Sequence, residues 1–135
     1  MSLLDAFLRD AWQQPVVKSD VWFAYRSDPA VGQGTKEDPW NGNDSKVPGN
    51  FDAKMSLVPA NTTVRLGPGT FTTKGHQGWT PQATGLRIVG AGMEVTTLKV
   101  SGTTATTTCA IGNPTSPPPL NGFEVSDLTI DCNLA

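Results

Sequence analysis

The chain has 135 residues with 10 basic and 12 acidic side chains, for a formal net charge of −2. This is the length of one ordinary domain. The charges are spread along the chain, so no region concentrates enough positive charge to neutralise a phosphate backbone, and nucleic acid is excluded as an expected partner. No apolar run approaches the roughly 20 residues that cross a bilayer, and the N-terminus lacks the features of a signal peptide, so we expect no membrane partner.

The composition is rich in Thr, Gly and Pro and poor in Glu and Lys. This bias favours strands and turns over long helices, and we expect an all-β fold. Cys109 and Cys132 are too few for a disulfide scaffold and lack the paired spacing of a zinc site. Buried free thiols are the favoured interpretation, and a disulfide in an oxidising compartment is the alternative.

Residues 1–15 are expected to form one amphipathic helix, because Leu4, Phe7 and Leu8 recur at helical spacing. Pro15 stands where this helix would end. A helix that binds a membrane surface would carry more basic residues. We therefore expect an N-terminal helix that caps the end of a core.

Turn-forming dipeptides follow one another through residues 27–50, which predicts a long surface loop. Asn41, Asn43 and Asp44 carry oxygens that suit calcium. No acidic residue stands where an EF-hand needs its bidentate ligand, so a set of Asx turns is favoured over a metal site.

Three short β-rich runs follow at residues 63–71, 85–92 and 123–133, each bounded by Gly, Pro or Asn. The first two align with an offset of 22 residues (86 − 64) between Val64 and Leu86. An offset of this size suits one coil of a solenoid.

Each run contributes one pair of inward-facing aliphatic residues: Val64 and Leu66, then Leu86 and Ile88, then Leu128 and Ile130. The third pair follows the second by 42 residues (128 − 86), and an insertion over residues 101–120 accounts for the excess. Stacked in register, the pairs form a continuous narrow core. Residues 16–135 are therefore expected to be the first coils of a parallel β-solenoid.

The runs LGPGTF at residues 66–71, LRIVGAG at 86–92 and DLTID at 127–131 resemble the opening of the right-handed parallel β-helix proteins grouped with pectate lyases and polygalacturonases. The resemblance covers roughly residue 20 to the C-terminus. It implies a right-handed solenoid of short sheets, an N-terminal helix at the open end, and a groove for polysaccharide along one sheet. Calcium as a cofactor and an extracellular or periplasmic location are implied by the resemblance alone.

Members of this family have many more coils, and their catalytic groups lie on coils that would follow Ala135. The resemblance thus implies the N-terminal cap and first coils of a polysaccharide lyase or glycoside hydrolase, inactive alone, with no catalytic residue assigned here. The alternative is a non-enzymatic solenoid module for adhesion or assembly. Because the last coil exposes Leu128 and Ile130 beside an unpaired edge, we also expect self-association.

Arg65 and Arg87 are the first candidates for contact with a substrate. The 22-residue alignment makes them neighbours on the outer face of adjacent coils. Like charges this close need an anion, and pairing with Asp127 or Asp131 is the favoured interpretation. The alternative is a site for the carboxylate of a uronic-acid sugar, which suits guanidinium groups.

Asp127 and Asp131 are expected to share the outer face of one strand. Four residues at about 3.3 Å each separate them by about 13 Å, which exceeds the separation of glycosidase acid pairs. We therefore expect polar exterior positions and no catalytic pair. His76 and Trp79 lie in a segment rich in turn residues, where a solvated histidine is the favoured interpretation and a sugar-contacting edge is the alternative.

Overall fold

A computed structural model of the chain describes residues 19–75, 78–79, 84–101, 111 and 122–133. The expected capping helix at residues 1–15 and almost all of the expected insertion at 101–120 lie outside these residues. In the described part, short strands predominate, the one helix has six residues, and every strand pair is parallel. The described chain is therefore mainly β, as the composition predicts.

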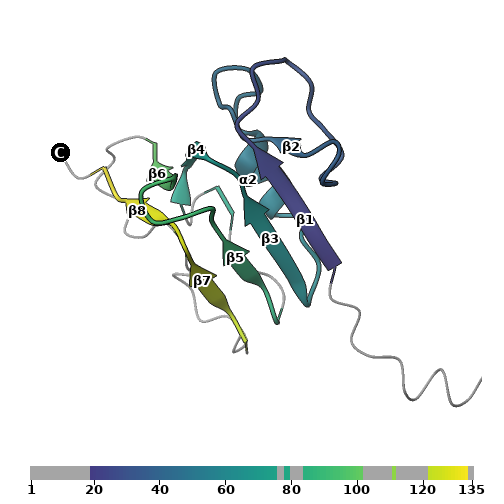
Figure 1. The fold of residues 1–135 in the computed structure, drawn as a ribbon, viewed down its shortest axis with the longest axis vertical. Helices are drawn as coiled ribbons and strands as arrows, with labels where there is room; N and C mark the ends of the chain where they lie inside the picture. Colours follow the sequence, from purple (N-terminus) through teal and green to yellow (C-terminus); the bar gives the residue numbers. More distant parts are fainter. Residues whose placement is uncertain (1–18, 76–77, 80–83, 102–110, 112–121, 134–135) are drawn as a thin grey trace, which may run out of the picture.

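Two parallel sheets make up the structure (Figure 1). The five-stranded sheet has the order β2-β1-β3-β5-β7, with β1 at Ser19–Ala24, β2 at Trp40–Asn41, β3 at Thr62–Leu66, β5 at Arg87–Val89 and β7 at Glu124–Ser126. The three-stranded sheet has the order β4-β6-β8, with β4 at Gly69–Thr73, β6 at Thr96–Val100 and β8 at Thr129–Asp131. From β3 onward, the chain gives one strand to the first sheet, turns a corner, and gives the next strand to the second.

Aliphatic side chains stack along each sheet at matching positions. In the five-stranded sheet Val64 lies opposite Ile88, and Ile88 lies opposite Val125. Phe71 and Leu98 are opposite each other in the three-stranded sheet. These residues belong to one hydrophobic cluster, in which Val125 is partly buried and the other four are fully buried. Each strand is too short to bury its own apolar face, so the stack between coils provides the core.

Aromatic rings fill the end of the core beside β2. The helix α2, Asn50–Met55, places Phe51 with its ring centroid 5.0 Å from that of Phe23 and 6.1 Å from that of Phe71. Gly42 allows this packing, because a Cβ there would lie 2.2 Å from the Phe71 ring. The short helix is therefore anchored to both sheets through one side chain.

The segment at 27–50, expected as a loop, consists mainly of turns and bends and also contains β2. The Oδ1 of Asn41 accepts a hydrogen bond from the Asn43 amide (2.9 Å), and the Oδ1 of Asn43 accepts one from the Ser45 amide (3.1 Å). These are Asx turns, as expected. Both asparagines are buried, and their side-chain amides donate to backbone carbonyls of Asp28 and Arg26, which fixes the path of the segment.

The register between β3 and β5 differs from the sequence alignment. Ile88, not Leu86, lies opposite Val64, so the offset is 24 residues (88 − 64) instead of 22. A shift of two residues keeps every side chain on the same face, so alternation alone cannot detect it. The turns before the strands set the register: the Asn61 amide donates to Thr84 O (2.9 Å), and a Cβ on Gly85 would lie 2.4 Å from Asn61 Oδ1.

The third run was expected as a single strand in line with the first two, and this is wrong. Val125 of β7 continues the stack in the five-stranded sheet, whereas Ile130 of β8 lies opposite Leu98 in the three-stranded sheet. Asp127 lies at the corner between them with φ 57°, and its carbonyl accepts a hydrogen bond from Gly92 N (2.8 Å). Residues 127–128 therefore connect one sheet to the other, and residues 129–131 lie in the second.

Candidate functional site

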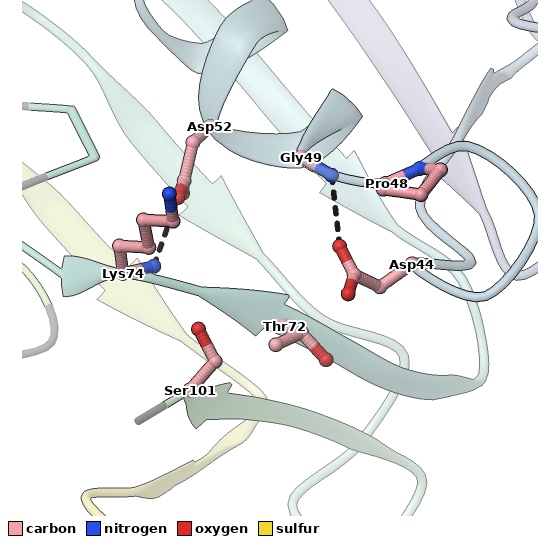
Figure 2. Close-up of a pocket in the computed structure, with 7 residues that line it drawn as sticks. All are labelled: Asp44, Pro48, Gly49, Asp52, Thr72, Lys74 and Ser101. Atoms are coloured by element: carbon pink, nitrogen blue, oxygen red, sulfur yellow. Dashed lines mark hydrogen bonds between the residues drawn. The ribbon is translucent and has the colours of Figure 1, made fainter. Parts of the chain in front are cut away.

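A cavity of about 280 Å³ opens between α2, the segment that precedes it, and the ends of β4 and β6. Figure 2 shows the side chains that surround it. Five of its seven lining residues have polar side chains; the lining consists of Asp44, Pro48, Gly49, Asp52, Thr72, Lys74 and Ser101. Both hydrogen-bond donors and acceptors therefore border one hollow.

Asp52 forms the inner wall of this cavity and is only 8% exposed. Its Oδ1 accepts a hydrogen bond from the Thr73 hydroxyl (2.6 Å), and its Oδ2 accepts one from the Lys74 amide (2.8 Å). Gly78 approaches the same carboxylate so closely that a Cβ there would lie 2.1 Å from Oδ2. These contacts dock α2 onto the end of β4.

Burial raises the pKa of Asp52 above its usual value, because desolvation disfavours the charged form. The hydrogen bonds from Thr73 and Lys74, together with the positive charge of Lys74, act in the opposite direction on this pKa. Desolvation is the larger effect. Asp52 thus retains its proton to a higher pH than an exposed carboxyl group.

The outer part of the cavity is held by backbone contacts. Asp44 Oδ1 accepts a hydrogen bond from Gly49 N (2.8 Å), and Ser101 Oγ donates to Thr73 O (3.2 Å). Asp44 and Lys74 are exposed, and Thr72 lies on β4. Their polar groups can therefore meet a molecule that enters from solvent.

A second group of polar side chains lies on the outer face of the five-stranded sheet. Arg65 Nε lies 3.2 Å from Asp20 Oδ2, and its guanidinium carbon lies 5.4 Å from the centre of the Trp22 ring. On the next strand, Arg87 Nε lies 3.0 Å from Glu124 Oε2. This outer face therefore carries an aromatic ring together with two guanidinium groups, each of which contacts a carboxylate.

Next to Arg87 the outer face is hollowed by a groove of about 190 Å³. Its other lining residues are Asn61, Thr63, Gly85 and Gly122. The two glycines lack side chains that would fill this space. The guanidinium of Arg87 is therefore the charged group of the groove.

The expected relation of the two arginines is corrected by the register. Arg65 lies opposite Val89, and Arg87 lies opposite Thr63, so the two are diagonal neighbours on one face. Their anionic partners are Asp20 and Glu124 (3.2 and 3.0 Å). The expectation that Asp127 or Asp131 neutralises them is wrong, because Asp127 lies at a corner and Asp131 lies in the other sheet.

Trp79 is 4% exposed, which argues against the alternative of an exposed edge that contacts sugars. Its ring packs in a T-shaped arrangement on Phe51 at 6.5 Å, so its faces belong to the core. His76 lies outside the described residues.

Cys132 is exposed and not the buried thiol that we expected, because it follows β8, the last strand of its sheet in the described chain. Cys109 lies outside the described part.

Sequence reasoning did not identify Trp22, Asp20 or the residues around Asp52. The run SDVWFA of β1 has two polar residues followed by four apolar ones, so it lacks the alternation that marks inward and outward positions; only the period of two in the formed strand places Asp20 and Trp22 on one face. No comparable local pattern brings Asp44, Asp52 and Lys74 together, because they come from three separate segments.

Comparisons of the chain with family models, with curated proteins and with solved structures find no match. In the described residues, no helix is long and apolar enough to cross a membrane. The same part of the chain contains no group of three or more His, Cys, Asp or Glu side chains arranged to hold a metal ion.

Proposed function

We propose that this chain forms the first coils of a right-handed parallel β-solenoid that binds an acidic polysaccharide, as the N-terminal part of a lyase or glycoside hydrolase. The solenoid is supported by the regular path of the chain, which from β3 onward gives one parallel strand to each sheet per coil. Right-handed crossovers are the general rule for parallel strands. The stack of Val64, Ile88 and Val125 is the kind of core that such coils share.

The observation that carries the binding proposal is the outer face with Trp22, Arg65 and Arg87 on three successive strands of the sheet order. Successive strands are about 4.8 Å apart, so an extended polymer that crosses them meets a new side chain at each strand. An aromatic face packs on the apolar face of a pyranose ring, and guanidinium groups bind carboxylates through paired hydrogen bonds. The groove beside Arg87 gives a carboxylate of the polymer access to this residue.

The reacting groups are proposed to lie on other coils of the solenoid. The carboxylates on the outer face support this, because Asp20 and Glu124 each contact an arginine. Each of these carboxylates is therefore already engaged by a guanidinium group.

Titration of the chain with oligomers of galacturonate and of alginate, with neutral dextran oligomers for comparison, tests the proposal by calorimetry. Arg87→Gln is expected to weaken binding of an acidic oligomer by about tenfold, since a hydrogen bond to a charged group contributes roughly 1.5 kcal/mol or more. Trp22→Ala is also expected to weaken binding, since it removes the aromatic face that packs on a pyranose ring. Lys46→Gln is the matched control, because it removes one exposed charge from the 27–50 segment.

No binding of either acidic oligomer would overturn the proposal and leave the non-enzymatic adhesion or assembly module as the remaining interpretation. Equal binding of neutral and acidic oligomers would overturn the role of the arginines. Turnover of either polymer by this chain would overturn the placement of the reacting groups on other coils.

A further inference from the structure

We propose that the cavity between α2 and the ends of β4 and β6 binds a neutral sugar unit through its hydroxyl groups. This inference rests on the proposed function, because it adds a second contact for the same glycan. The cavity is separate from the outer face, since none of its lining residues belongs to the five-stranded sheet. Its volume of about 280 Å³ is near the lower end of the range of ligand pockets, which suits a single small unit.

The lining combines groups that accept hydrogen bonds with groups that donate them. The Asp44 carboxylate accepts, the Lys74 ammonium donates, the Thr72 hydroxyl can do both, and the Ser101 hydroxyl, which donates to Thr73 O, can accept. In Figure 2 these side chains surround one hollow together with Asp52, which is 8% exposed. Neighbouring hydroxyl groups of a sugar match this combination, since each is at once a donor and an acceptor.

The charges of the lining argue against an ionic ligand. The carboxylate of Asp44 repels a phosphate or carboxylate, and the ammonium of Lys74 repels a metal cation or an amine. The described chain also has no cluster of metal-binding side chains here. A neutral ligand rich in hydroxyl groups avoids both penalties.

The walls of the cavity are fixed before a ligand arrives. Gly49 N holds Asp44, and the Thr73 hydroxyl and Lys74 N hold Asp52. Ser101 uses its hydroxyl proton to bond Thr73 O, so its oxygen faces a ligand as an acceptor. Side chains that are already ordered lose little entropy on binding, which favours recognition by a small site.

The test is a titration of the whole chain with methyl galactoside and methyl mannoside, followed through the amide resonances of Gly49, Lys74 and Ser101. We expect saturable shifts at these amides. Asp44→Asn keeps an oxygen for the Gly49 amide and loses one acceptor, so binding is expected to weaken about tenfold. Glu37→Gln, at an exposed position outside the cavity, is its matched control.

A second variant pair uses β4 alone. Thr72→Val removes a hydroxyl from the lining, whereas Thr70→Val makes the same change on the same face of the strand outside the cavity. Only Thr72→Val is expected to weaken binding. Resonances elsewhere in the spectrum report whether each variant keeps its fold.

The possible results separate this inference from the proposed function. Shifts confined to residues of the outer face, or equal weakening by the variants and their controls, overturn the cavity as a sugar site and leave the proposed function standing. Shifts at the cavity together with no binding of acidic oligomers support the cavity and overturn the outer face as the binding surface. No binding of any glycan overturns both.

Discussion

Two engineered cysteines on neighbouring strands test the 24-residue register directly. In the structure Arg65 lies opposite Val89, and the Cα atoms of facing residues are about 4.8 Å apart, within reach of a disulfide. Arg65 and Arg87 are displaced by a further two residues along the strand, about 6.6 Å, so their Cα atoms are about 8 Å apart. Arg65→Cys/Val89→Cys is therefore expected to oxidise, and Arg65→Cys/Arg87→Cys is not.

The bridge should also stabilise the fold by a calculable amount. It would close a loop from residue 65 to residue 89, and a loop of about 25 residues corresponds to about 3.5 kcal/mol of lost entropy in the unfolded chain near room temperature. Strain from the new bond lowers this figure, so the value is an upper bound. We expect a gain of about 2–3 kcal/mol in the free energy of unfolding.

Both double variants are made in a chain with Cys109 and Cys132 replaced by serine. Mass spectrometry counts free thiols after mild oxidation, and urea melts compare the oxidised and reduced forms of the same protein. Since the reduced form is its own control, loss of the native side chains cancels. Faster oxidation of the Arg65/Arg87 pair than of the Arg65/Val89 pair would refute the register and restore the 22-residue alignment.

Three further predictions follow from the core, the cavity and the sheet edge. Ile88→Ala should lower the free energy of unfolding by about 2–5 kcal/mol, because Ile88 is 0% exposed. If urea melts show a smaller loss of stability for Ile88→Ala than for the outward control Val89→Ala, the stack is contradicted. The pKa of Asp52 is raised above 3.8 in the folded chain, so protonation of this carboxyl group stabilises the folded state. The difference in unfolding free energy between the native chain and Asp52→Asn should therefore shift against the native chain as pH rises from about 3.8 through the folded pKa. A constant difference across acid melts would show that the pKa is not raised. The 135-residue chain should self-associate through the edge of β8, where Ile130 is 44% exposed. Light scattering should detect dimers whose fraction rises with concentration, and Ile130→Asp should weaken them. A chain that is monomeric at all concentrations would contradict this.

The sequence predicts which residues face inward more reliably than it predicts their partners. Of the three expected inward pairs, Val64 and Leu66 and then Leu86 and Ile88 are buried, whereas in the third pair Leu128 is partly buried and Ile130 is 44% exposed. Alternation with a period of two is a local property, so it can be read from one strand at a time. Partner choice depends on where each strand begins, and an error of two residues leaves the pattern of faces unchanged.

In the candidate site, too, the sequence predicts which way side chains face but not which residues they contact. The outward positions of Arg65 and Arg87 follow from alternation, yet their partners Asp20 and Glu124 depend on the register. The wall of the cavity depends on a contact between α2 and the end of β4, through Asp52 and the Thr73 hydroxyl (2.6 Å). No spacing within either segment predicts this contact, because 21 residues of chain (73 − 52) separate its two members.

The turns contain the information that the strand pattern lacks. Asn61, Gly85 and Gly122 each precede a strand of the five-stranded sheet, and each has a positive φ (56°, 77° and 73°). Asn and Gly are the residues that adopt this conformation at least cost, so they can be found in the sequence. Counting three residues onward from each reaches Val64, Ile88 and Val125, which is the observed stack. Alignment on the turn residues therefore gives the 24-residue offset. It also pairs β5 with β7 and not with β8, because coils of unequal length stack from the point where their turns coincide.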